Sequence, residues 1–553
     1  MNRPYAWEAS YPPGVRWDAP IEASTVPALF AASVERHGNR AAIEYLDRPM
    51  TYAELGASVA RTAAGLMGLG VGKGKGVALY LPNAPDHPIA FLGTLKAGGH
   101  VVHLSPLDAE RELAHKLHDS GARILVTTNH PPLLGNAQKL LASGHVDTLI
   151  VGEQSAWGPT PAPFPAAPAG AMTLQGLMAG GTPPATWPKV TPDDLAVLQY
   201  TGGTTGQPKG AMLTHANLTS AVAIYDVWAK GQDALRHGDD KVVGVLPFFH
   251  IYALTAILIR HLALGSEILV RPRFDAETTL RDIAVKKATL MLGVPTMYIA
   301  MLQHPEIGKR DLSSLRLVTC GGASLPVEVE QRFQQITGFR VGGGWGMTET
   351  SPAGTNLPLQ GDWKPGSIGM PLPGIVMQVV ALDDPRRVLE PNEKGEFRIM
   401  GPNVMRGYWN KPKETEQAFV DGFFLTGDLG YMDERGYFFL VDRKKDMILS
   451  GGFNVYPRII EEAIYEHPAV EEAVVIGVPD DYRGQSAKAF VKLKSGARPF
   501  TLDELRLFLA DKIGKHEMPT MIEIRDALPR TAVGKLSKKT LVDEEARKAG
   551  KGA

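Results

Sequence analysis

A loop rich in glycine and threonine follows the apolar run 195–198, which we expect to form a short buried strand. The loop contains Thr201, Gly202, Gly203, Thr204, Thr205, Gly206 and, beyond a Gln-Pro pair, Lys209. Glycines let the backbone approach phosphate oxygens, hydroxyls and free N–H groups donate to them, and the lysine adds positive charge. Alone, such a loop is more typical of a surface turn. It is also no Walker loop, because that motif needs Gly-Lys followed directly by Ser or Thr.

Four further segments each suit one part of a nucleotide-activating site, and together they favour the phosphate-binding interpretation. The small residues Gly321, Gly322 and Ala323 would let an adenine ring lie flat on the backbone. A second segment offers an aromatic face, a hydroxyl and a carboxylate, and its residues are Gly344, Trp345, Gly346, Met347, Thr348 and Glu349. Asp428 would accept hydrogen bonds from both ribose hydroxyls, and Lys535 stands on a Gly-containing loop near the C-terminus.

In this order the segments resemble the adenylate-forming superfamily of acyl-CoA synthetases, adenylation domains and luciferases, over nearly the whole chain. The sequences of segments 201–206, 247–250 and 442–451 are most similar to those of fatty acid:CoA ligases. The resemblance implies that a carboxylate attacks the α-phosphorus of Mg-ATP, giving acyl-AMP and pyrophosphate, and that coenzyme A then displaces AMP. No enzyme nucleophile is needed, which agrees with our expectation that the single cysteine, Cys320, is a buried packing residue.

The resemblance also implies how the nucleotide is held. The loop 201–209 is expected to bind the β- and γ-phosphates, Thr348 to donate to the α-phosphate, and Glu349 to contact Mg²⁺, for which a hard carboxylate is a suitable ligand. Trp345, where tyrosine is more usual, is expected to cover the adenine, with Gly321, Gly322 and Ala323 on its other side. The ribose is assigned to Asp428, and Arg443 is expected to make a second ribose or phosphate contact.

Two lysines of the C-terminal region match residues that serve the two half-reactions in this family. Lys535 matches the adenylation lysine that bridges the incoming carboxylate and the α-phosphate. Lys445 matches the hinge around which the small domain turns between the steps. This rotation is expected to remove Lys535 and to bring Gly451, Gly452 and Phe453 to the site, where glycines leave room for a pantetheine arm.

The expected partners are a small-molecule carboxylic acid, ATP and coenzyme A. We expect the loop 530–535 to be exposed, so a lysine acetyltransferase that modifies Lys535 is a further candidate partner. Acetylation would remove the charge that adenylation needs. A second copy of the chain, forming a homodimer, is open as well.

The resemblance also implies that the acyl chain lies beside His250, Tyr252 and Val294, among residues that are largely apolar and partly small. This lining suits a hydrocarbon better than a charged acid, because burying an unpaired carboxylate is costly. We therefore expect a medium-to-long chain fatty acid as the substrate. A dicarboxylate or an aryl acid stays open, as does a carrier protein in place of coenzyme A. His215 is expected to be an ordinary core or capping histidine.

Bulk properties bound the class of protein. The 553 residues are too many for one core, and 44% hydrophobic with 21% charged residues is typical of a globular protein. The net charge of -1 predicts no nucleic-acid binding. Charged residues interrupt the apolar stretch 252–270, so we expect no integral membrane segment. The lone cysteine fits a reducing compartment, and cytoplasmic residence is the default expectation.

The elements that must position these residues follow an alternating pattern. Helical periods alternate with β-branched runs, which favours an α/β fold with layered parallel sheets, and the Pro/Ala/Gly-rich stretch 157–188 predicts an irregular connection. After residue 442 we expect strands at 447–449, 473–477 and 486–494, helices at 458–466 and 502–512, and a frayed tail at 544–553. The prediction is therefore a large N-terminal domain, 1–442, and a small mobile α+β C-terminal domain, 443–553.

Overall fold

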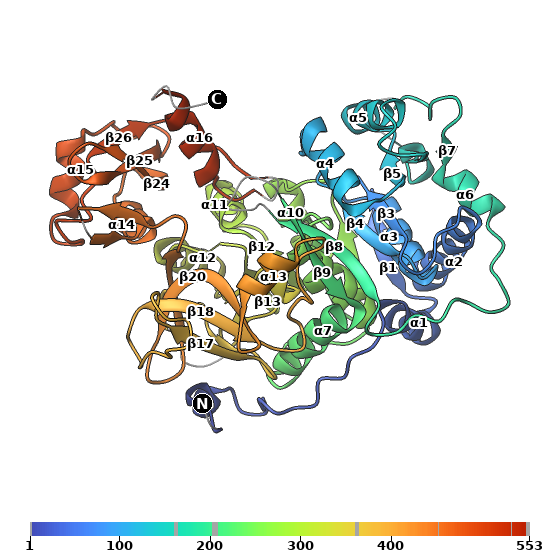
Figure 1. Cartoon of the computed structure of the whole chain (residues 1–553), viewed down its shortest axis with the longest axis horizontal. Helices are drawn as coiled ribbons and strands as arrows, with labels where there is room; N and C mark the ends of the chain where they lie inside the picture. Colours follow the sequence, from blue (N-terminus) through green and yellow to red (C-terminus); the bar gives the residue numbers. More distant parts are fainter. Residues whose placement is uncertain are drawn as a thin grey trace.

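The computed structural model describes residues 3–159, 164–201, 208–323, 325–359, 364–451, 453–531 and 534–548. Within these residues the strands form four sheets, three in a large N-terminal part and one in a smaller C-terminal part. Figure 1 shows the C-terminal elements as a lobe at the upper left, apart from the helices and strands at the upper right. The predicted α/β class and the division into a large and a small domain are confirmed.

The first parallel sheet carries the phosphate-loop candidate at one edge. Its strand order is β7-β6-β5-β3-β4-β8-β9, and all neighbours are parallel except the hairpin β8–β9. The bounds are β3 (Gly76–Leu79), β4 (His100–His103), β5 (Ile124–Thr128), β6 (Thr148–Gly152), β7 (Met172–Thr173), β8 (Leu195–Thr201) and β9 (Lys209–Thr214). The expected loop therefore connects the two strands of a hairpin.

The second large sheet brings the other nucleotide segments to one edge. Its order is β16-β15-β14-β13-β12-β10-β11-β1-β2, with parallel pairing from β14 to β1. The bounds are β1 (Ala41–Tyr45), β2 (Arg48–Thr51), β10 (Lys241–Gly244), β11 (Glu267–Val270), β12 (Leu290–Gly293), β13 (Leu317–Cys320), β14 (Gly342–Trp345), β15 (Thr355–Asn356) and β16 (Met370–Pro371). Because parallel strands end at the same edge, Gly321 after β13 and Gly346 after β14 become neighbours in space.

Helices fill the connections of these two sheets. They are α1 (Val26–His37), α2 (Tyr52–Gly68), α3 (Asp86–Lys96), α4 (Glu110–Ser120), α5 (Pro131–Ala142), α6 (Leu174–Gly180), α7 (His215–Lys230), α8 (Ile251–Ala253), α9 (Arg260–Ala263), α10 (Ala276–Ala284), α11 (Pro295–Gln303) and α12 (Val327–Thr337). Helix α2 illustrates why: Thr51 and Glu54 form a capping box, and Leu55, Val59 and Leu66 repeat at helical spacing on its buried face. His215 is buried at the start of α7 and accepts a hydrogen bond from Val26 N, so its expected core role is confirmed.

A third, antiparallel sheet was not predicted, and it carries Asp428. It consists of β17 (Val376–Val380), β18 (Gly395–Met400), β19 (Phe419–Val420), β20 (Phe423–Met432) and β21 (Phe438–Arg443), with α13 (Pro412–Ala418) beside it. Strand β21 pairs with β20 so that Asp428 lies opposite Arg443. The sheet thus places two expected site residues next to each other.

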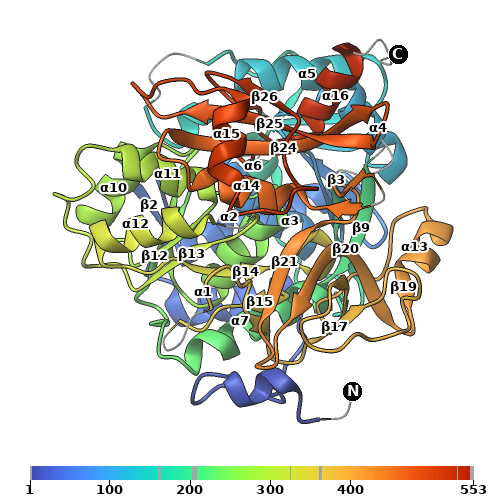
Figure 2. The same ribbon diagram turned by 90° about the vertical axis from the view of Figure 1, so that its left-hand side faces the viewer.

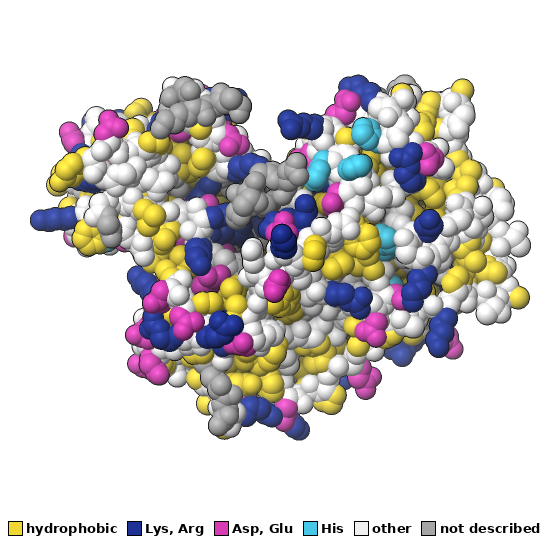
Figure 3. All heavy atoms as spheres, viewed as in Figure 1, with side chains coloured by type: hydrophobic (Ala, Val, Ile, Leu, Met, Phe, Trp, Pro, Cys, Tyr) yellow, Lys and Arg dark blue, Asp and Glu magenta, His cyan; other side chains and the backbone are white. Residues whose placement is uncertain are grey.

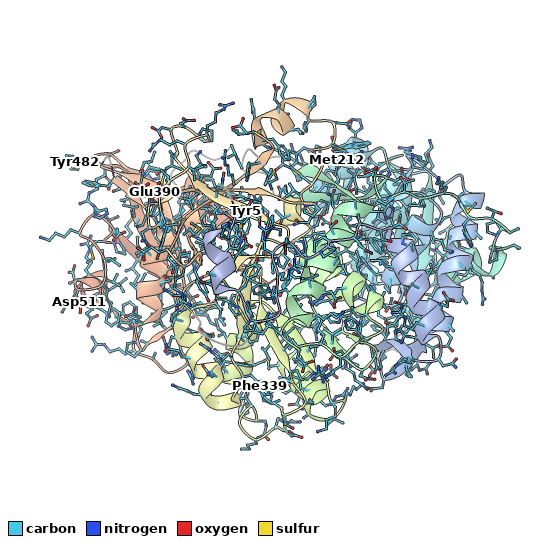
Figure 4. All side chains as sticks on the ribbon, turned by 90° about the horizontal axis from the view of Figure 1, so that it is seen from below. Tyr5, Met212, Phe339, Glu390, Tyr482 and Asp511 are labelled. Carbon is cyan, nitrogen blue, oxygen red and sulfur yellow. The ribbon has the colours of Figure 1, made fainter. Side chains whose placement is uncertain are left out.

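The C-terminal part has its own sheet and its own core. It contains β22 (Ile448–Ser450), β23 (Phe453–Val455), β24 (Val470–Asp480), β25 (Gly484–Leu493) and β26 (Met521–Ile524), with α14 (Pro457–Tyr465), α15 (Leu502–Leu509) and α16 (Lys538–Lys548). Figure 2 shows these elements side by side across the top of the molecule. In Figure 4 Tyr482 and Asp511 mark the outer edge of this lobe.

Three local predictions are wrong in part. The stretch 157–188, predicted to be irregular, includes β7 and α6 among its described residues. Thr173, the last residue of β7, caps α6 by accepting a hydrogen bond from Gly176 N. The tail expected to fray from residue 544 is helical to Lys548, because Arg525 pairs with Glu544 at 2.7 Å and Lys488 with Glu545 at 2.9 Å. The last predicted helix ends at Leu509 and not at residue 512.

The apolar stretch 252–270 folds into short pieces. It passes through α8, a π-helical turn (Leu254–Ile259), α9 and β11. Among the helices of the described residues, none is long and apolar enough to cross a membrane.

Candidate active site

A large cleft of about 1830 Å³ lies between the C-terminal lobe and the sheets of the large domain. Figure 3 shows the molecule hollowed at this place, with lysine and arginine side chains around the hollow. Of the residues predicted from the sequence, the cleft is lined by Thr201, Lys209, His250, Tyr252, Gly321, Gly322, Ala323, Gly344, Trp345, Gly346, Met347, Thr348, Glu349, Asp428, Arg443, Lys445 and Lys535. Val294 lines an adjoining small pocket with His250 and Lys535.

The remaining predicted residues fall into two groups. Gly202, Gly203, Thr204, Thr205 and Gly206 of the loop, and Gly452, lie outside the described residues. Gly451 and Phe453 belong to the hairpin β22–β23 and do not line the cleft. Phe453 is 58% exposed and packs only near His516 among the described aromatic rings, with the ring centroids 5.0 Å apart. In this domain arrangement Gly451 and Phe453 therefore stay outside the lining of the cleft.

Lys535 reaches across from the C-terminal lobe and lies against Gly322. A Cβ at Gly322, whose φ is +79°, would meet Lys535 Cε at 2.5 Å, so only glycine leaves room for the lysine. Thr296 Oγ1 donates to Gly534 O at 3.0 Å and fastens the loop to α11. The pKa of Lys535 is lowered to about 8, chiefly by burial and further by Arg443. The expected exposure of this lysine is therefore wrong in this arrangement, because it is half-buried and lines the cleft.

Glu349 is held at the cleft wall by a residue that sequence reasoning missed. Its carboxylate is buried in a short 3₁₀ helix, η4 (Thr348–Thr350), and its Oε1 accepts a hydrogen bond from Tyr408 Oη at 2.9 Å. Lys209 Nζ lies 5.1 Å from the centre of the Tyr408 ring. Tyr408 thus links the strand that follows the phosphate loop to Glu349. Nothing in the spacing of the three residues indicates this contact, because it joins separate elements.

Trp345 and Asp428 form the second pair. Trp345 Nε1 donates to Asp428 Oδ2 at 2.7 Å, and Arg443 Nε lies 3.2 Å from Asp428 Oδ1. The indole packs edge-on against Phe397 and is 8% exposed. Burial raises the pKa of Asp428, whereas the guanidinium of Arg443 lowers it. An indole therefore positions the carboxylate, a role that the predicted adenine stacking did not include.

His250 and Tyr252 border the cleft at the start of α8. His250 Nδ1 accepts from Tyr252 N at 3.2 Å, and burial with the neighbouring Lys535 lowers the pKa of His250 to about 3. The imidazole is therefore neutral at neutral pH. A Cβ at Gly321 would meet the Tyr252 ring at 2.7 Å, which explains the glycine there. Cys320 is buried beside them, as expected.

The segment around Lys445 joins the two parts of the chain. Lys444 Nζ pairs with Glu396 Oε2 at 2.9 Å on the large-domain side. Arg458 N, at the start of α14, donates to Asp442 Oδ2 at 2.9 Å across this segment. Lys445 lies between Lys444 and Arg458 in the sequence and is exposed. A backbone rotation there would break the bond between Asp442 and Arg458 and move Lys535 out of the cleft.

Comparison with known proteins identifies the family. The AMP-binding enzyme family matches residues 30–409, and the AMP-binding enzyme C-terminal domain matches residues 459–535. The chain therefore belongs to the AMP-binding enzyme family. A long-chain-fatty-acid–CoA ligase of Bacillus subtilis (strain 168) is 40% identical over 560 residues, which cover 99% of each chain.

Solved structures agree with this placement. ATP-bound MatB from Rhodopseudomonas palustris superposes with a TM-score of 0.83 at 31% identity, over 96% of this chain and 99% of that one. The apo form of the same protein gives 0.74 over the same share. An anthranilate CoA ligase in complex with anthranoyl-AMP gives 0.86 at 25% identity, over 96% and 99%. The chain as a whole thus superposes better on the ATP-bound form of MatB than on its apo form.

Proposed function

We propose that this protein is an AMP-forming fatty acid:CoA ligase that activates a medium-to-long chain fatty acid with Mg-ATP and transfers the acyl group to coenzyme A. One observation carries the proposal: Lys535 lies against Gly322 in the cleft that Glu349 and Asp428 also line. An adenylation reaction would use such a cation at the α-phosphate and such carboxylates for the nucleotide and its metal ion. The full-length similarity to long-chain-fatty-acid–CoA ligases supports the choice of acid and of coenzyme A.

In the first half-reaction the charge of Lys535 would act between the two reacting groups. A carboxylate oxygen attacks the α-phosphorus, so negative charge gathers on the phosphoryl oxygens and pyrophosphate leaves. A cation that lies in place beforehand stabilises that charge without reorganisation. Asp428, already oriented by Trp345 and Arg443, keeps lone pairs free for the ribose hydroxyls. Thr348 and the 201–209 loop are assigned to the phosphates.

Magnesium fits the residues at Glu349. The described residues contain no cluster of three or more His, Cys, Asp or Glu side chains that would hold a metal by themselves. Mg²⁺ commonly takes one or two carboxylates, keeps several waters and shares the phosphates of its substrate. Glu349 offers one such carboxylate, with one oxygen bonded to Tyr408 and the other available. The ion would supply neutralisation of phosphate charge.

The second half-reaction would need another domain arrangement. Lys535 lies in the cleft here, against Gly322, while Gly451 and Phe453 are not among the residues that line it. Rotation at Lys445 would withdraw Lys535 and bring the hairpin β22–β23 to the cleft, so that the thiol of coenzyme A attacks the acyl carbonyl and AMP leaves. We place the domain boundary at 442–443 for this reason.

An acid panel tests the proposal. Saturated acids of increasing length, aryl acids and acetate would be assayed separately for pyrophosphate release and for thioester formation with free coenzyme A. We expect both signals with medium or long chains. Pyrophosphate release without a coenzyme A thioester, but with loading of a carrier protein, would favour the alternative of a carrier-loading adenylation enzyme. No pyrophosphate release with any acid would contradict the proposal.

Acetylation of Lys535 remains a proposal with an added condition. An acetyltransferase would reach the amine only after the loop leaves the cleft, because the side chain lies against Gly322 here. Adenylation substrates should therefore protect Lys535 from acetylation, which peptide mapping after exposure to an acetyltransferase would measure. A homodimer is equally a proposal, which sedimentation of the purified protein would decide.

A further inference from the structure

Arg260 is a buried cation on the wall of the cleft. It is 5% exposed, begins α9 directly after the π-helical turn, and lines the cleft together with Tyr225, Trp228 and Ala256. π-helical turns interrupt the regular hydrogen bonding of a helix and are frequent at functional sites. The neighbouring residues named here are aromatic and apolar. A buried guanidinium beside them is unfavourable in a pocket that binds only a hydrocarbon chain.

The hydrogen bonds of Arg260 are incomplete. One guanidinium nitrogen donates to Tyr225 O at 2.9 Å, and the group lies 5.4 Å from the centre of the Tyr225 ring. Nε is buried and has no hydrogen-bond partner among the residues that the structure describes. No carboxylate of the described residues lies within ion-pair distance of it, and Asp226 and Asp240 act on its charge only at longer range. Buried charges in proteins are normally paired, because desolvation without a partner is costly.

Arg271 provides the internal comparison. It is also an arginine in the core of the large domain, 8% exposed, and it follows β11 a few residues after Arg260. Its Nε pairs with Asp282 at 2.7 Å and another of its nitrogens pairs with Glu44 at 3.0 Å. Arg398, a third buried arginine, lies away from the cleft and also has no carboxylate within ion-pair distance among the described residues, but its Nε donates to Gln378 Oε1 and another of its nitrogens donates to Pro385 O. Of the three, Arg260 is the one that lines the cleft, and its Nε has no partner among the described residues.

The position of Arg260 places it far from the reacting end. Tyr252 touches Gly321 near the nucleotide segments, and Arg260 follows it by eight residues in one helical stretch. Eight helical residues span on the order of 10 Å along the axis. Tyr252 and Arg260 both line the cleft. A chain of this length that enters beside Tyr252 would therefore reach Arg260.

We propose that Arg260 recognises a carboxylate at the far end of the acyl chain, so that the enzyme accepts medium-chain α,ω-dicarboxylic acids. The inference rests on the proposed function and names a substrate class for it. An ω-carboxylate would pair with the guanidinium from the cleft side, where its charge has no carboxylate partner among the described residues. A methyl terminus would leave that charge unpaired.

The first test uses the unaltered protein and varies the acid. Decanedioic acid, its monomethyl ester and decanoic acid have similar length but differ in charge at the distal end. We expect kcat/KM for coenzyme A thioester formation to be at least about tenfold higher for the diacid than for the monoester, because the site would be left unpaired by the ester. Equal values for the diacid and the monoester would overturn the inference.

The second test varies the protein. Arg260→Met keeps the length of the side chain without its charge, and should lower the diacid-to-monoester ratio at least about tenfold, while Arg260→Lys should keep part of it. Ala256→Val is the matched control, because it narrows the same wall without changing charge and should affect both acids alike. A ratio unchanged in Arg260→Met would overturn the inference. Thermal unfolding of each variant would show that it is folded.

The outcomes separate this inference from the proposed function. Thioester formation with decanoic acid, together with no preference for the diacid, overturns the role of Arg260 and leaves the ligase assignment intact. Absence of pyrophosphate release and of thioester with every acid contradicts the proposed function itself, and the role of Arg260 with it.

Discussion

The C-terminal lobe presents two segments to the large domain in opposite ways. The loop with Lys535 is inserted into the cleft, where Gly322 makes room for the lysine and Thr296 bonds to Gly534. The hairpin β22–β23, with Gly451 and an exposed Phe453, belongs to the same lobe but does not line the cleft. Since both segments sit on one compact unit, inserting one excludes the other. The difference predicts that the two half-reactions respond separately to changes in the lobe.

The largest effect is expected for Lys535→Ala. Adenylation, measured as pyrophosphate release, should fall by about 10²–10³-fold, as for the removal of one group that stabilises charge in a transition state. Thioester formation from supplied acyl-AMP should change little, because that step is proposed to run with Lys535 withdrawn. An equal loss in both assays would give Lys535 a structural role and remove the distinction between the two segments.

Lys445→Pro should give the reverse pattern, with a loss of roughly 10-fold or more in thioester formation. Proline holds φ near about -65° and would block a hinge that must change its backbone angles. Acyl-AMP should accumulate while acyl-CoA formation fails, which quantifying both products would show. Lys445→Ala removes the charge but leaves the backbone free, and should retain both activities. Normal thioester formation by the proline variant would place the pivot elsewhere.

The pH dependence of the two steps sharpens the same comparison. The lowered pKa of Lys535, about 8, means that the free enzyme loses the ammonium as the pH rises through 8. Adenylation kcat/KM should therefore fall above this pH, by about tenfold per unit in the limit. The titration of His250 should not change the rate near neutral pH, since its pKa is lowered to about 3. If thioester formation from acyl-AMP also fell above pH 8 in this way, the two half-reactions would not differ in their need for Lys535.

The smallest effect is expected for Phe453→Ala. The KM for coenzyme A should rise several-fold, because an aromatic contact to the pantetheine arm is worth about 0.5–1.5 kcal/mol. Adenylation should be unaffected, since Phe453 lies outside the cleft during that step. Leu507→Ala, at another exposed apolar residue on α15, is the control and should change neither assay. An effect on pyrophosphate release would show that the hairpin already contributes to the first step.

Much of the fold and of the site was predictable because the signals are local. Runs of β-branched residues indicate the parallel strands. The motif residues stand at the ends of strands, which the sheets bring to one edge. The antiparallel sheet that carries Asp428 was missed because its strands contain mixed polar and apolar residues and long connections. The helical C-terminal tail was missed because the ion pairs that fasten it, Arg525 with Glu544 and Lys488 with Glu545, join segments distant in the chain.

By itself, the sequence determined the family and the residue types for adenylation, since glycines at turns, a lysine on a loop and carboxylates after strands are properties of short segments. Only the tertiary structure decided how these groups are held and which are in place together. It pairs Trp345 with Asp428 and Tyr408 with Glu349, inserts Lys535 while Phe453 stays exposed, and leaves Arg260 without a carboxylate among the described residues. The physical reason is that hydrogen bonding and desolvation depend on neighbours brought together by packing, and residue spacing along the chain does not encode those neighbours.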